Sequence, residues 1–429
     1  MKRSSAVWSN FLVTSPEILP HQKTAGTALV FSTYPIRNPR HGGQLRSEAL
    51  LDAYGAAFNK VVRCAIFYAP VWSRREYSAQ DIPSPADVTE QIVHRPDLEP
   101  WILGASPTTS PEVRARVIRM FKEYQPVAVI FEQPFLFRAI SGVMEELGLE
   151  VPIIYSSQNV EHVMVQEIFK RSGSLGRNEK FVHELKESES ELARVSAGTI
   201  AVSHEDADVL SAMGAPRVLV QGNGIAPFAH SGSKHNRVRR VMHDLAISSY
   251  ALYVASSHRP NADSFVDVIG TRLGYLPSDS MIFLAGTVGR ILGPLLSETD
   301  PVWGRLFWNR AFNWEKVSPS TLSGLIERAS CILLPITTGG GSNLKTAEAI
   351  LSGRPIVATP MAFRGFEEFL DLPNIHICAS PEEFQAKVAT VLGQQFIPSD
   401  TSTAVQRSRV LWEYTLSDLP RWLTETPGA

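Results

Sequence analysis

Short apolar runs alternate with longer stretches of helical periodicity along most of the chain. Apolar runs of this length, bounded by glycine, proline and other turn residues, are typical of buried strands. Strands that alternate with helices predict an α/β fold built from parallel, doubly wound sheets. The expected strands are residues 27–33, 61–68, 127–131, 151–155, 198–202 and 217–220, and then 250–255, 281–284, 331–336, 355–358 and 374–378.

Several of the intervening helices carry recognisable start signals. Ser203 and Ser380 each open a capping-box pattern, and Ser318 is followed by Pro319, a residue favoured at the first helical position. Residues 70–108 are rich in proline and serine and lack a clear period, which predicts a long excursion or lid. Further helices are expected at residues 45–58, 111–124, 175–195 and 402–416.

The alternation is interrupted once, near the middle of the chain. A turn cluster, Gln221-Gly222-Asn223-Gly224, precedes a basic run at residues 230–240, and 429 residues exceed one ordinary core. We therefore expect two Rossmann-like domains joined by a solvated linker. The expected divisions are an arm at 1–26, a first domain at 27–222, a linker at 223–240, a second domain at 241–400, and a C-terminal helix and tail at 401–429 with the option of packing back on the first domain.

Composition narrows the class of protein. The chain is 44% hydrophobic and 20% charged, as in ordinary globular proteins, and its net charge of −2 gives no general attraction to nucleic acid. Cys64, Cys331 and Cys378 each lie in an apolar run, which predicts buried thiols in a reducing compartment. No apolar run could span a bilayer and no signal peptide is evident, so the cytoplasm is the expected location. The basic helix at 111–124 predicts a solvated face, with peripheral contact to a membrane surface as the alternative.

The most informative stretch is residues 330–353. A short apolar run leads into Gly339, Gly340 and Gly341, where the missing Cβ atoms let a ligand approach the backbone. Ser342 is the expected N-cap of the following helix, and Gly353 the expected stop. Free N–H groups and the positive end of the helix dipole would then face the glycine loop. This arrangement predicts an anion site.

Two side chains of that helix favour a bound ligand. Lys345 stands in the first turn, where a cation opposes the helix dipole, and Glu348 lies three residues further on the same face. A bound phosphate would favour the lysine, and the carboxylate could accept hydrogen bonds from sugar hydroxyls. The alternative is a solvated Lys–Glu pair after a tight turn. A P-loop is excluded because Leu344 stands where the motif requires its second glycine.

Polar residues also follow other strands, at the edge of a parallel sheet where ligands bind. In the first domain they are the loop at 34–44, Glu132 and the segment 158–162. In the second domain they are the segment 256–261 and Gly286-Thr287. For the loop at 34–44, a ligand site and a polar surface loop are equally consistent with the pattern.

These motifs resemble those of glycosyltransferase family 4, whose members have the GT-B architecture. The strand at 331–336 with Gly-Gly-Gly-Ser-Asn-Leu-Lys-Thr-Ala-Glu-Ala is similar to that family's nucleotide-sugar motif, and Gln221-Gly222-Asn223-Gly224 to its inter-domain hinge. His41-Gly42-Gly43-Gln44 resembles the acceptor-side glycine loop, and Gln158-Asn159-Val160-Glu161 a His-Asn-Val-Glu segment of the family. The resemblance implies two Rossmann-like domains that face each other across a cleft.

The resemblance also implies roles for individual residues. Catalytic candidates are Lys345, Glu348, Glu132 and His162. Donor-binding candidates are Ser256, Arg259, Asn261, Gly286, Thr287, Gly339, Gly340, Gly341, Ser342, Asn343, Lys345, Thr346 and Glu348. Acceptor-binding candidates are Gly42, Gly43, Gln44, Arg46, Gln158 and Asn159. The chain departs from the family pattern in two places at the donor site. Many members carry a glutamate where this chain has Gly340, and many carry a Gly-Arg and a later Lys where this chain has Ser256–Asn261. In addition, Gln158 replaces a histidine.

The activity implied is transfer of a hexosyl group from a nucleotide-diphosphate sugar to a glycan, lipid-linked or small-molecule acceptor, as in polysaccharide biosynthesis. Retention at the anomeric carbon and a mechanism without metal or other cofactor are expected. Two alternatives stay open. One is a catalytically silent partner that binds a sugar nucleotide, and the other is a GT-B epimerase or hydrolase. The nucleotide, the sugar, the acceptor and the oligomeric state do not follow from the sequence.

Overall fold

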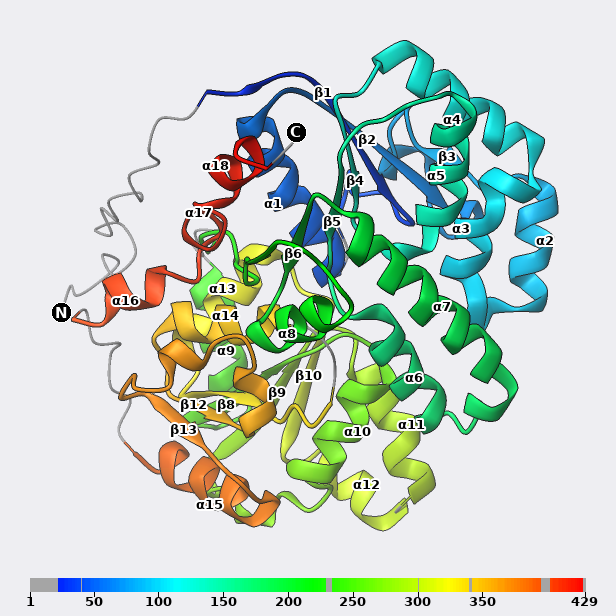
Figure 1. Ribbon diagram of the computed structural model, residues 1–429. Helices are drawn as coiled ribbons and strands as arrows, with labels where there is room; N and C mark the ends of the chain where they lie inside the picture. The colour runs from blue at the N-terminus through cyan, green and yellow to red at the C-terminus, as the bar shows by residue number, and fades with distance from the viewer. Residues whose placement is uncertain are drawn as a thin grey trace. The chain divides into compact units, whose positions relative to one another are not determined.

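The apolar runs of the first half of the chain form a seven-stranded parallel sheet (Figure 1). The computed structural model describes residues 22–39, 41–228, 234–299, 301–338, 342–394 and 402–426. They form two units: an N-terminal unit with the described residues up to Asn223 and those from Thr415, and a C-terminal unit of Gly224–Tyr414.

The sheet of the N-terminal unit has the strand order β3-β2-β1-β4-β5-β6-β7, and every neighbouring pair is parallel. The order reverses between β1 and β4, so the loops that follow these strands diverge at the carboxyl edge and leave room for a ligand. The strands are β1 (Thr24–Ser32), β2 (Phe58–Phe67), β3 (Ile82–Pro83), β4 (Ala128–Phe131), β5 (Ile153–Ser156), β6 (Gly198–Ala201) and β7 (Val218–Val220).

Helices cover this sheet because alternate strand residues point to opposite faces. Leu29 and Phe31 of β1 share one core with Val117 of α4 and Ile140 of α5. Trp422 of α18 lies so close to Gly198 of β6 that a Cβ there would be 2.5 Å from its ring. The helices are α1 (Gly42–Ala57), α2 (Ala86–His94), α3 (Glu99–Thr109), α4 (Pro111–Tyr124), α5 (Phe137–Glu146), α6 (Glu161–Arg171), α7 (Leu175–Val195), α8 (His204–Ala212) and α18 (Leu419–Thr424).

The C-terminal unit has a parallel sheet of six strands in the order β10-β9-β8-β11-β12-β13. Here the order reverses between β8 and β11, again opening the carboxyl edge. The strands are β8 (Ser249–Val254), β9 (Ser280–Ala285), β10 (Ala311–Glu315), β11 (Cys331–Leu334), β12 (Ile356–Ala358) and β13 (Ile375–Ile377).

Alternation along β8 divides this unit into two cores. Tyr250 and Leu252 pack on the side of α13 and α14, whereas Ala251 and Tyr253 pack on the side of α10 and α15. The helices are α9 (Lys234–Asp244), α10 (Arg259–Val268), α11 (Gly289–Thr299), α12 (Pro301–Phe307), α13 (Pro319–Arg328), α14 (Leu344–Ser352), α15 (Pro381–Leu392), α16 (Ala404–Ser408) and α17 (Trp412–Thr415).

Several predictions of local structure are confirmed. Helices α4 and α7 have the predicted bounds. The hydroxyls of Ser203, Ser318 and Ser380 each accept a hydrogen bond from the backbone N–H three residues later, as an N-cap does. All three cysteines are free and buried. No helix within the described ranges is long and apolar enough to cross a membrane.

The expected excursion at residues 70–108 is wrong. This stretch contains β3, α2 and α3, and several of its prolines stand at helix starts, with Pro85 as the N-cap of α2 and Pro100 in the first turn of α3. Val88, Ile92 and Leu103 form a small core of their own. Proline at the start of a helix produces the same local pattern as proline in a loop, which explains the difference.

Two further stretches differ from expectation. The second half of the expected linker is helix α9, which places Val238 and Met242 in the core. The single helix expected at 402–416 is divided into α16 and α17. It breaks because the backbone at Val410 and Trp412 bonds to Ile225 in a bridge between distant parts of the chain.

Candidate functional site

The central motif lies at the switch point of the C-terminal sheet, directly after β11. Gly339, Gly340 and Gly341 lie outside the described residues. Helix α14 begins at Leu344, and its N-cap is Asn343 rather than the predicted Ser342, because Asn343 is the last residue with extended backbone angles. Ser342 is buried just before it. Gly353 ends the helix with φ 65°, as predicted.

Lys345 joins this helix to the loop that follows β8. Its amine donates to Asn261 Oδ1 at 2.7 Å and stands 5.9 Å from the centre of the Tyr253 ring. The Asn261 amide donates in turn to the carbonyl of Ser256 at 3.1 Å. Three predicted donor-binding residues, Ser256, Asn261 and Lys345, are therefore in one hydrogen-bonded cluster.

Lys345 and two ionisable groups that feel its charge, Glu348 and His258, have shifted pKa values. Burial lowers the pKa of Lys345 to about 8, against the opposing effect of Glu348. Burial raises the pKa of Glu348 to about 7, against the effect of Lys345. Burial and the charge of Lys345 lower the pKa of His258. A cation and a carboxyl group that both titrate near neutrality are typical of a functional site.

Other predicted donor residues support the loop instead of presenting a side chain. Gly286 has φ 97°, and a Cβ there would lie 2.3 Å from the carbonyl oxygen of Ala255. The Thr287 hydroxyl accepts from the backbone N–H of Ser257 at 2.8 Å. Gly286 and Thr287 thus hold the Ser256–Ser257 turn in place.

Two donor assignments fit the structure poorly. Thr346 is fully buried and its hydroxyl donates to the carbonyl of Ala362 at 2.6 Å, so this side chain anchors α14. The Arg259 side chain is 63% exposed and pairs with Asp263 at 2.7 Å, one turn along α10. A phosphate contact would require that side chain to leave Asp263.

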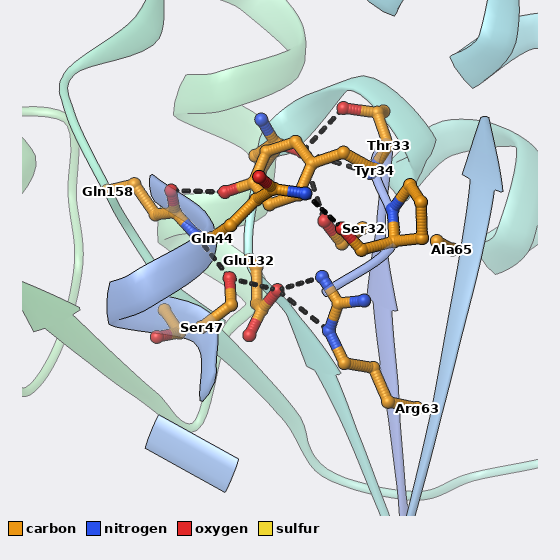
Figure 2. Close-up of polar contacts among 12 residues, drawn as sticks. Ser32, Thr33, Tyr34, Gln44, Ser47, Arg63, Ala65, Glu132 and Gln158 are labelled. Atoms are coloured by element: carbon orange, nitrogen blue, oxygen red, sulfur yellow. Dashed lines mark hydrogen bonds and ion pairs between the residues drawn. The ribbon is translucent and has the colours of Figure 1, made fainter. Parts of the chain in front are cut away.

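In the N-terminal unit, polar side chains gather where β1, β4 and β5 end (Figure 2). Glu132 Oε2 accepts from Arg63 at 2.9 Å and from the Ser47 hydroxyl at 2.8 Å. Gln158 donates to the Ser47 hydroxyl at 2.9 Å and accepts from the Tyr34 hydroxyl at 2.5 Å. The result is one continuous network that joins the loops after β1, β4 and β5.

Glu132 does not fit its predicted catalytic role. Its side chain has no exposed surface and its ion-pair partner Arg63 is 6% exposed. A carboxylate in this setting is the counter-ion of a buried arginine, out of reach of an acceptor.

The predicted acceptor loop is also largely structural. A Cβ on Gly43 would lie 2.8 Å from both Gln158 Oε1 and the Tyr34 hydroxyl, so the glycine makes room for their bond. Gln44 is buried and donates to the carbonyl of Pro35. Gly42 begins α1 and is exposed.

Arg46 forms hydrogen bonds with the turn at 221–223 of the N-terminal unit. Its guanidinium donates to the carbonyls of Gln221 at 2.8 Å and Gly222 at 3.2 Å, and to Asn223 Oδ1 at 3.2 Å. Burial lowers its pKa to about 10. These bonds leave Arg46 a positioning residue for the turn at 221–223, and the predicted acceptor contact does not fit.

His162 is held by a residue that sequence reasoning missed. The Glu189 carboxylate accepts from the His162 backbone at 3.0 Å, lies 2.7 Å from its Nδ1, and accepts from the Glu161 N–H at 2.8 Å. A carboxylate at this point caps the N-terminus of α6. His162 is therefore built into a helix cap, which argues against its predicted catalytic role.

Three predicted acceptor residues do line a common pocket. Gly43, Gln158 and Asn159 border a pocket of about 350 Å³ in the N-terminal unit. Glu161, which is not among the predicted site residues, borders it as well. Burial, and next the Glu189 carboxylate, raise the pKa of Glu161 to about 8. The described residues contain no group of three or more His, Cys, Asp or Glu side chains arranged to hold a metal ion.

Comparison with known proteins gives a fold and no close relative. No family model matches the sequence, and no curated protein matches it. Among solved structures, the sucrose-phosphate synthase of Thermosynechococcus elongatus is 13% identical with a TM-score of 0.59, over 93% of this chain and 94% of that one. HepE of Anabaena, solved with UDP and glucose, is 14% identical with a TM-score of 0.63, and the match covers 93% of this chain and 100% of that one.

A third similar structure is the glycosyltransferase WaaG of lipopolysaccharide biosynthesis, 14% identical with a TM-score of 0.56, over 94% of this chain and 100% of that one. These matches span both units of the chain, with their two parallel sheets. The chain therefore has the α/β fold of the GT-B glycosyltransferases.

Proposed function

We propose that this protein is a glycosyltransferase that moves a hexosyl group from a nucleotide-diphosphate sugar to an acceptor, with retention at the anomeric carbon. The observation that carries the proposal is the cluster of Lys345, Glu348 and Asn261 at the carboxyl edge of the C-terminal sheet. The sequence resemblance assigns donor binding to these residues, and their joint position after β8 and β11 supports it. The similar structures named above include one solved with UDP and glucose.

For this reaction the protein must stabilise the negative charge of the departing diphosphate. As the bond between the anomeric carbon and the phosphate oxygen breaks, the diphosphate takes the electron pair, while the acceptor oxygen bonds to the same carbon. The diphosphate then takes the proton of the acceptor hydroxyl. An ammonium has three N–H donors and Asn261 takes one from Lys345, which leaves two for phosphate oxygens.

The remaining groups fit around this step. The start of α14 adds the positive end of a helix dipole on the side of the leaving group. Glu348 would accept hydrogen bonds from hydroxyls of the donor. With a lysine and a helix N-terminus to balance the charge, we propose that no metal is required.

A donor screen tests this site. Wild type, Lys345→Met and Glu348→Gln are heated with UDP, GDP, dTDP and ADP sugars, with Lys387→Met of α15 as a control that removes a lysine charge elsewhere in the same unit. One class of nucleotide should raise the Tm of the wild type and of the control. Loss of a charge-assisted hydrogen bond should weaken binding to the Lys345 variant by about 10-fold to 100-fold. Equal stabilisation of all four proteins would remove Lys345 and Glu348 from the donor site.

A further inference from the structure

The pocket of the N-terminal unit has two unlike sides. Its polar side carries Tyr34, Gln158, Asn159 and Glu161 at the ends of β1 and β5. Its other side is apolar and comes from the 3-10 helix η4 (Pro134–Leu136), α6 and α7: Phe135, Met164, Val165, Ile168, Phe169 and Phe181. The volume of about 350 Å³ is within the range of sites that hold small molecules.

The apolar side, called the wall below, consists of Phe135, Met164, Val165, Ile168, Phe169 and Phe181. Met164, Val165, Ile168 and Phe169 recur at the spacing of one helix face on α6. Phe181 of α7 stands edge-on to Phe169, with ring centres 5.9 Å apart. Aromatic pairs of this geometry hold one another in place and give a ligand a firm surface.

One member of the wall is not covered by the protein. Ile168 is 46% exposed although it borders the pocket. Contact with an apolar ligand group would remove this surface from water, which is favourable.

The two carboxyl groups at the pocket, Asp97 and Glu161, carry little free charge. Asp97 accepts from Arg95 at 3.0 Å, and this ion pair lowers its pKa. Glu161 is 3% exposed, and its Oε1 accepts from the Asn159 amide at 3.4 Å. Burial raises its pKa to about 8, which favours the protonated form at neutral pH. A protonated carboxyl both donates and accepts hydrogen bonds, as a hydroxyl group requires.

We propose that the pocket binds the acceptor, and that the acceptor is a neutral amphiphile with an apolar chain or ring. Its apolar part lies along the wall of α6 and α7, and its hydroxyl part faces Glu161 and Asn159. This assignment rests on the proposed transferase function. It adds the substrate class, since an apolar chain or ring would also cover the aliphatic residues of the wall, among them the exposed Ile168.

Two simple probes differ in the apolar part alone: octyl β-D-glucoside, kept below its micelle concentration, and methyl β-D-glucoside. Their affinities for the full chain are measured by calorimetry. Burying about three methylene groups on the wall should favour the octyl compound by about 30-fold or more. The matched variants are Ile168→Glu, at the pocket, and Val163→Glu, on the same helix and 43% exposed but outside the pocket lining.

The proposal expects Ile168→Glu to lose at least tenfold in octyl glucoside affinity and Val163→Glu to bind like the wild type. Equal affinity for the two glucosides, or no binding of either, would overturn it, as would equal losses in both variants. The donor screen is independent of these probes. If nucleotide binding succeeds while the octyl preference is absent, the acceptor class is wrong and the transferase proposal stands.

Discussion

The buried pair of Arg63 and Glu132 gives the sharpest test of how the N-terminal unit is interpreted. The perturbation is Arg63→Met, which keeps an unbranched apolar side chain and removes the charge. Glu132 would then keep the Ser47 bond and lose its cation in a place with no exposed surface. Removing one partner of a buried ion pair costs about 3–5 kcal/mol, because a charge is left unpaired.

This cost can be converted into a melting shift. For a unit of about 150–250 residues, 1 kcal/mol corresponds to about 2–4 °C, so the Tm of the N-terminal unit should fall by about 6–20 °C. The double variant Arg63→Met/Glu132→Gln, which removes both charges, should recover most of that loss. Thermal unfolding of the wild type, the two single variants and the double variant completes the cycle.

The same variants separate a structural role from a catalytic one. A structural Glu132 predicts that activity measured well below the Tm survives in the double variant. If Arg63→Met melts like the wild type while Glu132→Gln is inactive yet stable, the structural interpretation of Glu132 is refuted.

Three further predictions concern glycine geometry and titration. Gly286→Ala should lower stability by about 3 kcal/mol or more, because the new Cβ meets the Ala255 carbonyl at 2.3 Å and φ is 97°; Gly274→Ala, with open space around it, should change the Tm little in the same scan. Glu161→Gln should gain stability relative to the wild type as pH rises from about 5 to about 8. A carboxyl group whose pKa is raised to about 8 in the folded state makes the wild type less stable as pH rises over that interval. Urea unfolding at several pH values measures the difference in free energy of unfolding, and a difference that does not change with pH would contradict the raised pKa. Donor affinity should fall as pH rises through about 8, where Lys345 loses its charge, and Lys345→Met should lack that fall in calorimetric titrations.

Much of the fold could be predicted because its signals are local. Apolar runs fixed the strands, and serine caps with proline at N1 placed the starts of α13 and α15. Proline can also begin a helix, as Pro85 and Pro100 do in α2 and α3, and there the rule that treats proline as a loop signal fails. The break between α16 and α17 depends on Ile225, almost two hundred residues away in sequence, and no local pattern encodes it.

The same distinction between local and distant signals applies to the site residues. Lys345 and Asn261 could be found because each follows a strand of the switch point. Glu132 follows a strand and Arg46 follows the glycine loop, which makes both plausible ligand contacts in the sequence. Their actual partners, Arg63 and the turn at 221–223, come from other elements and cannot be recognised before the fold is known.

The importance of Glu189 could have been recognised from its position in the sequence of α7. It lies on the buried stripe of α7 with Val182, Leu185 and Leu192, where a carboxylate needs partners. Its partners, the N-terminus of α6 and His162, are known only once the fold is known.

The central claim is sugar transfer at the Lys345 cluster, and a coupled turnover assay tests it most directly. The nucleotide sugar that stabilises the wild type is incubated with alkyl and aryl glucosides, and release of nucleoside diphosphate and formation of glycoside are followed together. Sugar transfer at this cluster should give equal amounts of both products and should depend on the acceptor. Both products should be lost in Lys345→Met and formed at normal rates in Lys387→Met. Consumption of the donor without an acceptor, binding without turnover, or full activity of Lys345→Met would contradict it.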